Sequence, residues 1–285
     1  MTGPRAGTVT AWGASGLSVR FGSRLALDQV SIGVPSGQVT AVVGGDGAGK
    51  TTLLRCVAGA LAPAQGTVRR PDAHRIGYLP PSTGLYDDLS VEENLSFRSA
   101  VYAVPDRDRE AAVGEYLKRA GLAAARDRLA GQLSGGMRRK LGVIAAMLPG
   151  PELLVLDEPT TGVDPVSRAD LWWLIARAAA AGAAVLMSTT YLDEAARAAR
   201  VLVLDAGRTL AAGTPAEIVE AVPGTIAVAS RRPEDTQERR RAWRRAGAWR
   251  IWQPVAVTGS VLVTPDLQDA VCVAALRREL EAGDD

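Results

Sequence analysis

The clearest chemical pattern in the sequence is the run of eight residues from Gly44 to Thr51, GGDGAGKT. It matches G-x-x-x-x-G-K-[ST], in which glycines allow successive backbone N–H groups to turn toward a phosphate chain. At these positions Lys50 would neutralise β and γ oxygens, and the Thr51 hydroxyl would bind magnesium. The alternative is a glycine-rich turn that matches by chance, as happens in about one chain in a hundred. Because the chain has only three lysines against thirty arginines, an accidental lysine here is less expected.

Two adjacent carboxylates, Asp157 and Glu158, follow the apolar run from Leu153 to Leu156. The run predicts a buried strand, and an α/β sheet places its ligand crevice at the carboxyl ends of its strands. Downstream of a phosphate loop, the pair favours magnesium binding by Asp157 and polarisation of an attacking water by Glu158. Without that loop, a solvated strand end would be the preferred interpretation.

A third candidate is the segment LSGGM, from Leu133 to Met137. Its serine and paired glycines stand where a helix is predicted to begin, and a helix N-terminus attracts anions. In isolation, a capped helix start is the simpler interpretation of this segment.

Taken in order, these segments resemble the ATP-binding domains of ABC transporters. GGDGAGKTT matches Walker A, LSGGM the signature motif, LLVLDEP Walker B, and Thr161 to Pro165 the D-loop. The resemblance extends from about Leu17 to Ile218. It implies an α/β fold of the P-loop NTPase (ABC ATPase) type, with ATP and Mg²⁺ as cofactors.

The resemblance also implies roles for individual residues. An aromatic residue before the phosphate loop stacks on adenine in that family, and Phe21 stands there; its alternative role is that of an ordinary half-buried strand residue. Ser134 and Gly136 would bind the γ-phosphate of ATP held by an opposite subunit, so that two chains face head to tail. Glu158 is the expected catalytic residue, and Thr51 and Asp157 are the expected metal ligands. The expected nucleotide-binding residues are Phe21, Gly44, Gly45, Asp46, Gly47, Ala48, Gly49, Lys50, Thr51, Thr52, Ser134, Gly135, Gly136, Asp164 and Thr190.

Within the family, the segments IGYLP, GLYDDLSVEENL, STTYLDEA and AGRTLAAGTPAEI are most similar to ATPases of drug and ABC-2-type exporters. This implies a membrane permease that docks near Gly84 to Leu95, and a location at the cytoplasmic face of the cell membrane. No run approaches the roughly 18 apolar residues that a membrane-spanning helix needs, so any membrane role requires a separate permease subunit. The alternatives are a soluble ABC ATPase without a permease and a regulatory module that only binds ATP.

Two positions depart from the family pattern. Where the family has a glutamine that contacts magnesium and the attacking water, this chain has Pro81, whose ring has no side-chain donor or acceptor. Where the family has a histidine that contacts the γ-phosphate, it has Thr190, which is shorter and never cationic. The only histidine, His74, lies upstream and is predicted to be a surface-loop residue. We therefore expect a slow site of its own and favour a heterodimer with a second, fully equipped ATP-binding subunit.

The composition predicts a globular chain, because 47% of the residues are hydrophobic and 22% are charged. A formal net charge of +2 gives no support for a nucleic-acid partner, and we predict none. The arginine-dense segment Arg239 to Arg245 is predicted to be a solvated helix face. The two cysteines, Cys56 and Cys272, are predicted to be buried free thiols rather than a disulfide.

The elements that must position these residues alternate between strand and helix, which predicts a largely parallel sheet. Residues 1–14 are predicted to be a tail. Residues 15–221 are predicted to form the ABC nucleotide-binding domain, with an antiparallel β subdomain and a helical subdomain at about residues 82–150. Residues 222–285 are predicted to form a small α+β accessory domain, with a strand at Val255 to Val263 and a helix from Asp266.

Overall fold

The computed structural model describes residues 11–104, 106–255 and 257–282. Its central sheet has six strands in the order β5-β6-β7-β3-β8-β9, of which the first five run parallel and β9 is antiparallel to β8. The strands are β5 (Ile76–Leu79), β6 (Leu153–Leu156), β7 (Ala184–Thr189), β3 (Val39–Val43), β8 (Arg200–Asp205) and β9 (Arg208–Gly213). Every residue of β3, β6 and β7 is buried, as expected for parallel strands that are covered on both faces. The prediction of a largely parallel sheet is confirmed.

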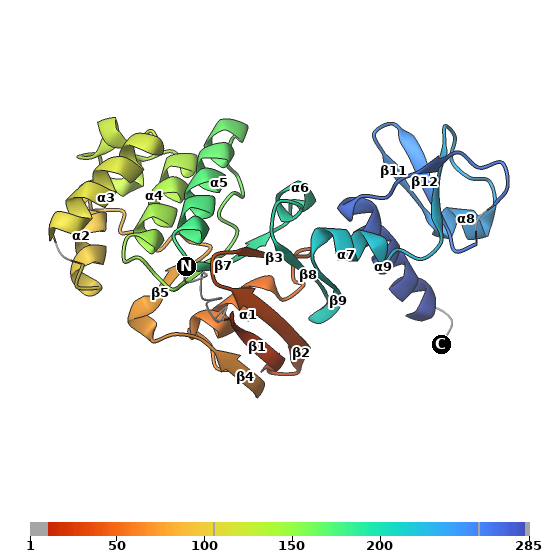
Figure 1. The fold of residues 1–285 in the computed structure, drawn as a ribbon, viewed down its shortest axis with the longest axis horizontal. Coiled ribbons are helices and arrows are strands. Elements are labelled where there is room, and N and C mark those ends of the chain that lie inside the picture. The colour runs from red at the N-terminus through yellow and green to blue at the C-terminus, as the bar shows by residue number, and fades with distance from the viewer. Residues whose placement is uncertain (1–10, 105, 256, 283–285) are drawn as a thin grey trace, which may run out of the picture.

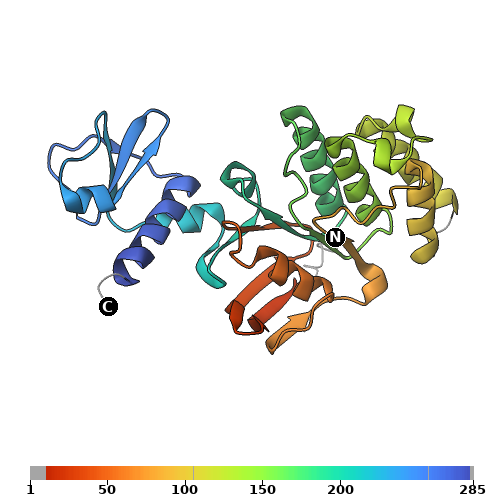
Figure 2. The ribbon, with the colours of Figure 1, turned by 180° about the vertical axis from the view of Figure 1, so that it is seen from behind.

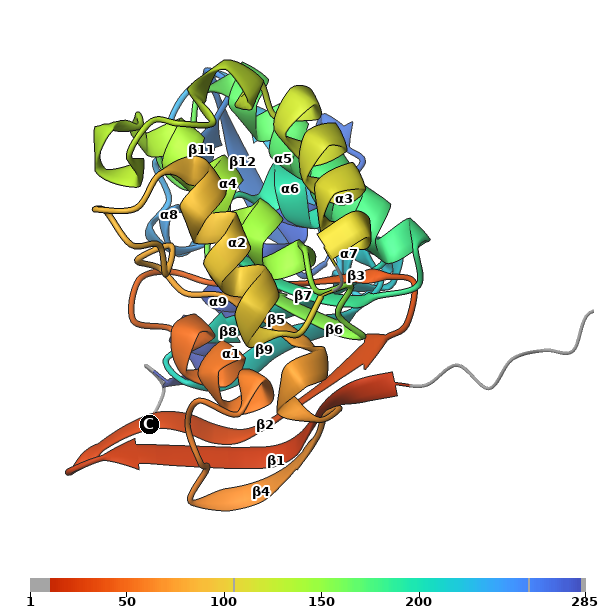
Figure 3. The ribbon, with the colours of Figure 1, turned by 90° about the vertical axis from the view of Figure 1, so that its left-hand side faces the viewer.

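Alternate residues of the central strands face two separate cores. On one side lies α1 (Lys50–Ala58), together with a three-stranded antiparallel sheet in the order β2-β1-β4. Its strands are β1 (Ala11–Phe21), β2 (Arg24–Pro35) and β4 (Gln65–Arg69). On the other side lie α4 (Gly135–Met147) and α5 (Pro165–Ala180). Figure 3 shows these layers edge on, with the antiparallel sheet below and the helices above. The cores fix the strand ends from which the candidate residues project.

The helices α2 (Val91–Val101) and α3 (Asp106–Arg119) pack beside α4 at one end of the molecule (Figure 1). Ser90 begins α2 through a capping box with Glu93, and Ser134 caps α4 by accepting a hydrogen bond from the backbone N–H of Met137. The predicted helix start at Ser134 is therefore confirmed. Short 3₁₀ turns cover Ala73–Arg75, Ala123–Ala125 and Ala130–Gln132, and His74 is exposed in the first of them.

The segment after β9 forms a smaller sheet at the end of the molecule away from α2 and α3, as Figures 1 and 2 show from opposite sides. A short helix, α7 (Pro215–Glu220), connects β9 to this sheet, and another short helix, α6 (Leu192–Ala195), lies earlier in the chain, between β7 and β8. The small sheet has the order β11-β12-β10-β13, and its strands are β10 (Thr225–Ala229), β11 (Ala242–Arg245), β12 (Ala248–Gln253) and β13 (Leu262–Val263). The remaining helices are α8 (Thr236–Arg240) and α9 (Leu267–Ala282).

Two predictions for this region were wrong. The helix predicted at Arg239 to Arg245 ends at Arg240, because the chain turns into β11 and pairs with β12 through a hairpin at Ala246 and Gly247, both with positive φ. The strand predicted at Val255 to Val263 is confined to Leu262–Val263, with residue 256 outside the described residues. In both cases strand pairing, rather than local sequence pattern, decides the structure.

Two further observations concern the cysteines and the hydropathy of the helices. Cys56 is buried and Cys272 is only half-buried, and both are free thiols. Within the described ranges, no helix combines the length and the apolar character that crossing a bilayer requires.

Candidate functional site

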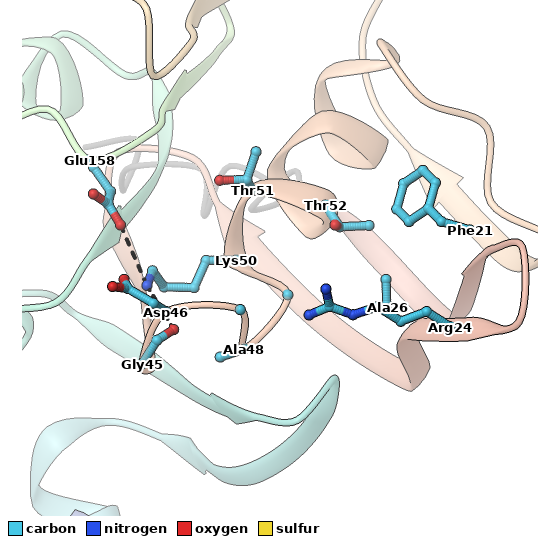
Figure 4. Close-up of a pocket in the computed structure, with 12 residues that line it drawn as sticks. Phe21, Arg24, Ala26, Gly45, Asp46, Ala48, Lys50, Thr51, Thr52 and Glu158 are labelled. Carbon is cyan, nitrogen blue, oxygen red and sulfur yellow. Dashed lines mark hydrogen bonds and ion pairs between the residues drawn. The ribbon is translucent and has the colours of Figure 1, made fainter.

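The glycine loop, the start of α1 and the tip of the β1–β2 hairpin surround a pocket of about 380 Å³ (Figure 4). That volume lies in the range of small-molecule sites. The pocket is lined by Phe21, Arg24, Ala26, Gly45, Asp46, Gly47, Ala48, Gly49, Lys50, Thr51, Thr52 and Glu158. The fold thus brings ten of the expected site residues together from three separate segments. It adds Arg24 and Ala26, which sequence reasoning missed.

Close packing explains two of the glycines in the loop. A Cβ on Gly44 would lie 2.4 Å from the carbonyl oxygen of Leu204 at the end of β8, and one on Gly49 would lie 2.7 Å from that of Ala26 on β2. Gly49 also has a φ of +105° at the N-cap of α1, a conformation that favours glycine. The loop is therefore held between two sheets, with the positive end of the α1 dipole directed into the pocket.

Lys50 lines the pocket but is only 5% exposed. Its Nζ donates hydrogen bonds to the carbonyl oxygens of Gly44 (2.8 Å) and Gly45 (3.1 Å) and lies 3.4 Å from Oε1 of Glu158. Figure 4 shows this ion pair across the mouth of the loop. A phosphate chain would offer Lys50 anionic acceptors, which form stronger hydrogen bonds than neutral carbonyls do.

Asp157 and Glu158 point in different directions from the end of β6. Asp157 is fully buried; its Oδ1 accepts a hydrogen bond from the Ser188 hydroxyl at 2.7 Å, and its Oδ2 has no hydrogen-bond partner among the described residues. Glu158 has a φ of +50°, a strained conformation for a residue with a side chain, and such strain is common at functional sites. Its carboxylate lies in the pocket and accepts a hydrogen bond from the Thr161 hydroxyl at 3.2 Å.

These groups fit a hard divalent cation. Oδ2 of Asp157 is a buried carboxyl oxygen with no hydrogen-bond partner in the described part of the chain, and Thr51 lines the pocket. Hydroxyl and carboxylate oxygens are the ligands that Mg²⁺ prefers, together with phosphate oxygens of its substrate.

Six expected nucleotide-binding residues do not line this pocket: Gly44, Ser134, Gly135, Gly136, Asp164 and Thr190. Ser134 caps α4, and Asp164 caps α5 by accepting hydrogen bonds from the backbone N–H groups of Val166 and Ser167. The hydrogen bonds from Ser167 hold the pKa of the Asp164 carboxyl below its usual value. A Cβ on Gly136 would lie 3.7 Å from Oδ2 of Asp164, so the two motifs lie side by side, with Asp164 exposed and Gly136 half-buried.

The two positions that depart from the family pattern are both exposed, and neither lines the pocket. The carbonyl oxygen of Pro81 accepts a hydrogen bond from the Arg139 guanidinium at 3.0 Å. Thr190 directly follows Thr189, whose hydroxyl donates to the buried carboxylate of Glu194 at 2.7 Å. The Thr160 hydroxyl donates to the same Glu194 oxygen at 2.8 Å.

Arg24 extends from the hairpin toward the glycine loop (Figure 4). Its Nη2 lies 3.3 Å from the position that a Cβ on Gly47 would occupy, and it forms no ion pair within the described part of the chain. The hairpin register, in which Phe21 pairs with Arg24, is the signal that would have found it. Because Arg24 pairs with Phe21, it lies at the same end of the hairpin as the expected adenine-stacking residue.

We expect Arg24→Gln to weaken ATP binding about tenfold, because a guanidinium beside the loop adds charge-assisted hydrogen bonds to phosphate oxygens. Adenosine binding should stay unchanged. Titration calorimetry with ATP and with adenosine measures both. Arg20→Gln is the matched control, since Arg20 is an exposed arginine on the same hairpin outside the pocket. An equal loss of adenosine affinity would contradict a phosphate contact.

Comparison with known proteins places the chain beside transporter ATPases. Residues 27–161 match the family model described as ABC transporter. The chain is 39% identical over 220 residues to the daunorubicin resistance ATP-binding protein DrrA3 of Streptomyces coeruleorubidus, covering 73% of this chain and 70% of that protein. It is 36% identical over 215 residues to the Nod factor export ATP-binding protein I of Cupriavidus metallidurans, covering 72% of this chain and 71% of that one.

One relative is much longer than the matched region. The chain is 38% identical over 222 residues to "Probable multidrug ABC transporter ATP-binding protein YbhF" of Escherichia coli, covering 74% of this chain and 38% of that protein. Among solved structures, an ATP-binding subunit of an ABC transporter aligns with a TM-score of 0.69 at 28% identity, over 74% of this chain and 92% of that one. The dimeric cassette MJ0796 aligns with a TM-score of 0.65 at 20% identity, over 71% and 98%, which shows a shared fold.

Proposed function

Since the chain belongs to the family of ABC transporter ATP-binding proteins, we propose that it binds and hydrolyses MgATP as the ATP-binding subunit of an exporter. The observation that supports this most strongly is the pocket of Figure 4, in which Lys50, the glycine loop and Glu158 meet at one end and Phe21 lies at the other. The relatives named for drug resistance and Nod factor export favour an exporter.

The reaction follows from the groups in the pocket. Phe21 is 51% exposed and offers its ring face to adenine, while the loop amides and Lys50 bind the phosphate chain. As Lys50 turns to the phosphates, its ion pair with Glu158 is replaced, and the Glu158 carboxylate becomes free to accept a proton from water. The strained backbone at Glu158 keeps that carboxylate in the pocket rather than in the core beside Asp157.

Thr51 and Asp157 are the proposed ligands of Mg²⁺. The ion would neutralise charge on the β- and γ-phosphates. Because Oδ1 of Asp157 is already bonded to Ser188, Oδ2 is the oxygen left for this role. Ser188 also accepts a hydrogen bond from the backbone N–H of Glu158 at 2.9 Å, so one hydroxyl orients both acidic residues.

A nucleotide-sandwich dimer accounts for the motifs outside the pocket. Ser134, Gly135 and Asp164 are exposed and Gly136 is half-buried, and none of the four lines the pocket of their own chain. A helix N-terminus exposed in this way suits a phosphate held by a second ATP-binding subunit. We propose that the chain also binds a membrane permease and therefore lies at the cytoplasmic face of the membrane.

The simplest test compares the purified chain, alone and co-expressed with a neighbouring permease. Co-purification with the permease and ATP hydrolysis that depends on Lys50 are the expected results. A chain that hydrolyses ATP but never retains a permease would be a soluble ABC ATPase. One that binds ATP without turnover in any complex would be a regulatory module, the second candidate, which the side-chain groups missing at Pro81 and Thr190 favour.

We further propose that the second subunit is a different protein, with this chain supplying the degenerate site. Pro81 lacks a side-chain hydrogen-bonding group, and Thr190 lacks a cationic one. Pro81→Gln combined with Thr190→His is expected to raise the turnover of the lone chain by at least about tenfold, as positioned catalytic groups contribute on the order of 10² or more. Phosphate-release assays measure it. Rapid hydrolysis by the unmodified homodimer would refute the heterodimer.

A further inference from the structure

Arg139 connects the helix that carries Ser134 to the edge of the pocket. It lies on α4, and its Nη1 donates a hydrogen bond to the carbonyl oxygen of Pro81 at 3.0 Å. The parallel register of β5 and β6 pairs Leu79 with Leu156. Pro81 and Glu158 each follow the last residue of their strand by two positions, so both lie at the carboxyl edge of this strand pair. A guanidinium bonded to the Pro81 carbonyl therefore stands near the acidic end of β6.

Close packing holds Arg139 in this position. A Cβ on Gly142, one turn further along α4, would lie 2.7 Å from Cδ1 of Leu79 and 3.3 Å from Cβ of Thr83, so α4 lies directly against the segment that contains Pro81. Burial lowers the pKa of the Arg139 guanidinium, and the negative charges of Glu158 and Asp157 oppose that shift. The field of both carboxylates thus reaches the guanidinium, which nevertheless stays charged because its ordinary pKa is so high.

The charges of the site explain why a second cation is needed. Asp157 and Glu158 are adjacent acids, and Lys50 lies 3.4 Å from Glu158. When Lys50 pairs with a phosphate chain instead, Glu158 loses its ion pair with Lys50 and at the same time faces a polyanion. Like charges brought this close repel one another strongly in a partly buried site. Mg²⁺ held by Asp157 would offset part of this charge.

We propose that Arg139 is a positioning residue that keeps a positive charge near Glu158. With that charge in place, the phosphates of ATP can pair with Lys50 without repelling the catalytic carboxylate. The inference rests on the proposed ATP site and adds a residue of the signature helix to its electrostatics. Residue 81 takes part through its backbone, because the Pro81 carbonyl oxygen accepts the hydrogen bond that holds the guanidinium in place, although the proline side chain has no polar group.

The test is a double-mutant cycle on ATP binding, measured by calorimetry in the presence of Mg²⁺. Arg139→Gln is expected to raise the Kd for ATP about tenfold in the parent chain, and to change it less than twofold in a Glu158→Gln background, where the repelling charge is absent. Arg139→Lys should restore most of the parent affinity, because it keeps the charge. Adenosine affinity should not change in any of these variants.

Arg138→Gln is the matched control. Arg138 is the neighbouring arginine on α4, and its guanidinium pairs with Asp87 and with the carbonyl oxygen of Ala130, away from the pocket. If Arg138→Gln weakens ATP binding as much as Arg139→Gln does, or if Arg139→Gln acts equally in both Glu158 backgrounds, the inference is wrong. In either case ATP binding that still depends on Lys50 would leave the proposed function intact.

Discussion

Lys50→Ala is expected to weaken ATP binding by on the order of 10²-fold, or about 3 kcal/mol, because it removes a buried charge that donates to the phosphate chain. The same change leaves the carbonyl oxygens of Gly44 and Gly45 without their present donor and Glu158 without its ion pair. Calorimetric titration with MgATP measures the loss. ATP hydrolysis at saturating nucleotide should fall with it, since the γ-phosphate is no longer held in place.

Lys118→Ala is the control for this experiment. Lys118 is one of only three lysines in the chain and is exposed in the last turn of α3, far from the glycine loop in sequence. It should bind ATP like the parent chain. If Lys50→Ala and the parent chain hold ATP equally well, the pocket of Figure 4 is not the nucleotide site and the proposed function fails.

Glu158→Gln is expected to lower the turnover number by on the order of 10²- to 10³-fold while ATP affinity stays the same or increases. The amide keeps the size of the side chain and can still accept a hydrogen bond from the Thr161 hydroxyl, but it cannot take a proton from water. It also removes a negative charge that faces the incoming phosphates. A loss in turnover number without a loss of affinity distinguishes a base from a binding residue.

Glu152→Gln serves as the comparison, because Glu152 lies just before β6 and pairs with Arg75 at an exposed position. Its turnover should match that of the parent. Both variants should be assayed alone and with the second ATP-binding subunit that we propose, since a homodimer and a heterodimer differ in how many sites the substitution affects. Full turnover by Glu158→Gln in the lone chain would show that another group accepts the proton.

Some elements of the fold follow from local sequence alone. The apolar run from Leu153 to Leu156 predicts a strand buried on both faces because no polar side chain interrupts it, and it is one. Ser90 with Glu93, and Ser134 before paired glycines, predict helix starts through backbone hydrogen bonds that involve residues at most three positions apart. Signals of this range do not depend on the rest of the chain.

The segment after residue 223 shows where such reasoning fails. The arginine-dense run around Arg239 has a helical composition, yet Ala242–Arg245 forms a strand because β12 is available to pair with it. The buried carboxylate of Asp269, which accepts hydrogen bonds from Arg245 and Arg250, then ties that hairpin to α9. Partners far apart in sequence decide this structure, and no local pattern encodes them.

The sequence by itself indicated the family and predicted a phosphate loop and an acidic pair at the end of β6, because these predictions depend on short motifs whose residue types suit phosphate and metal chemistry. Only the tertiary structure decided which side chains share the pocket. It brought Arg24 to the glycine loop, buried Asp157 while leaving Glu158 in the pocket, and placed Arg139 against Pro81. These relations depend on hairpin register, strand register and helix packing, and each of them is fixed by contacts between segments that are separate in the chain.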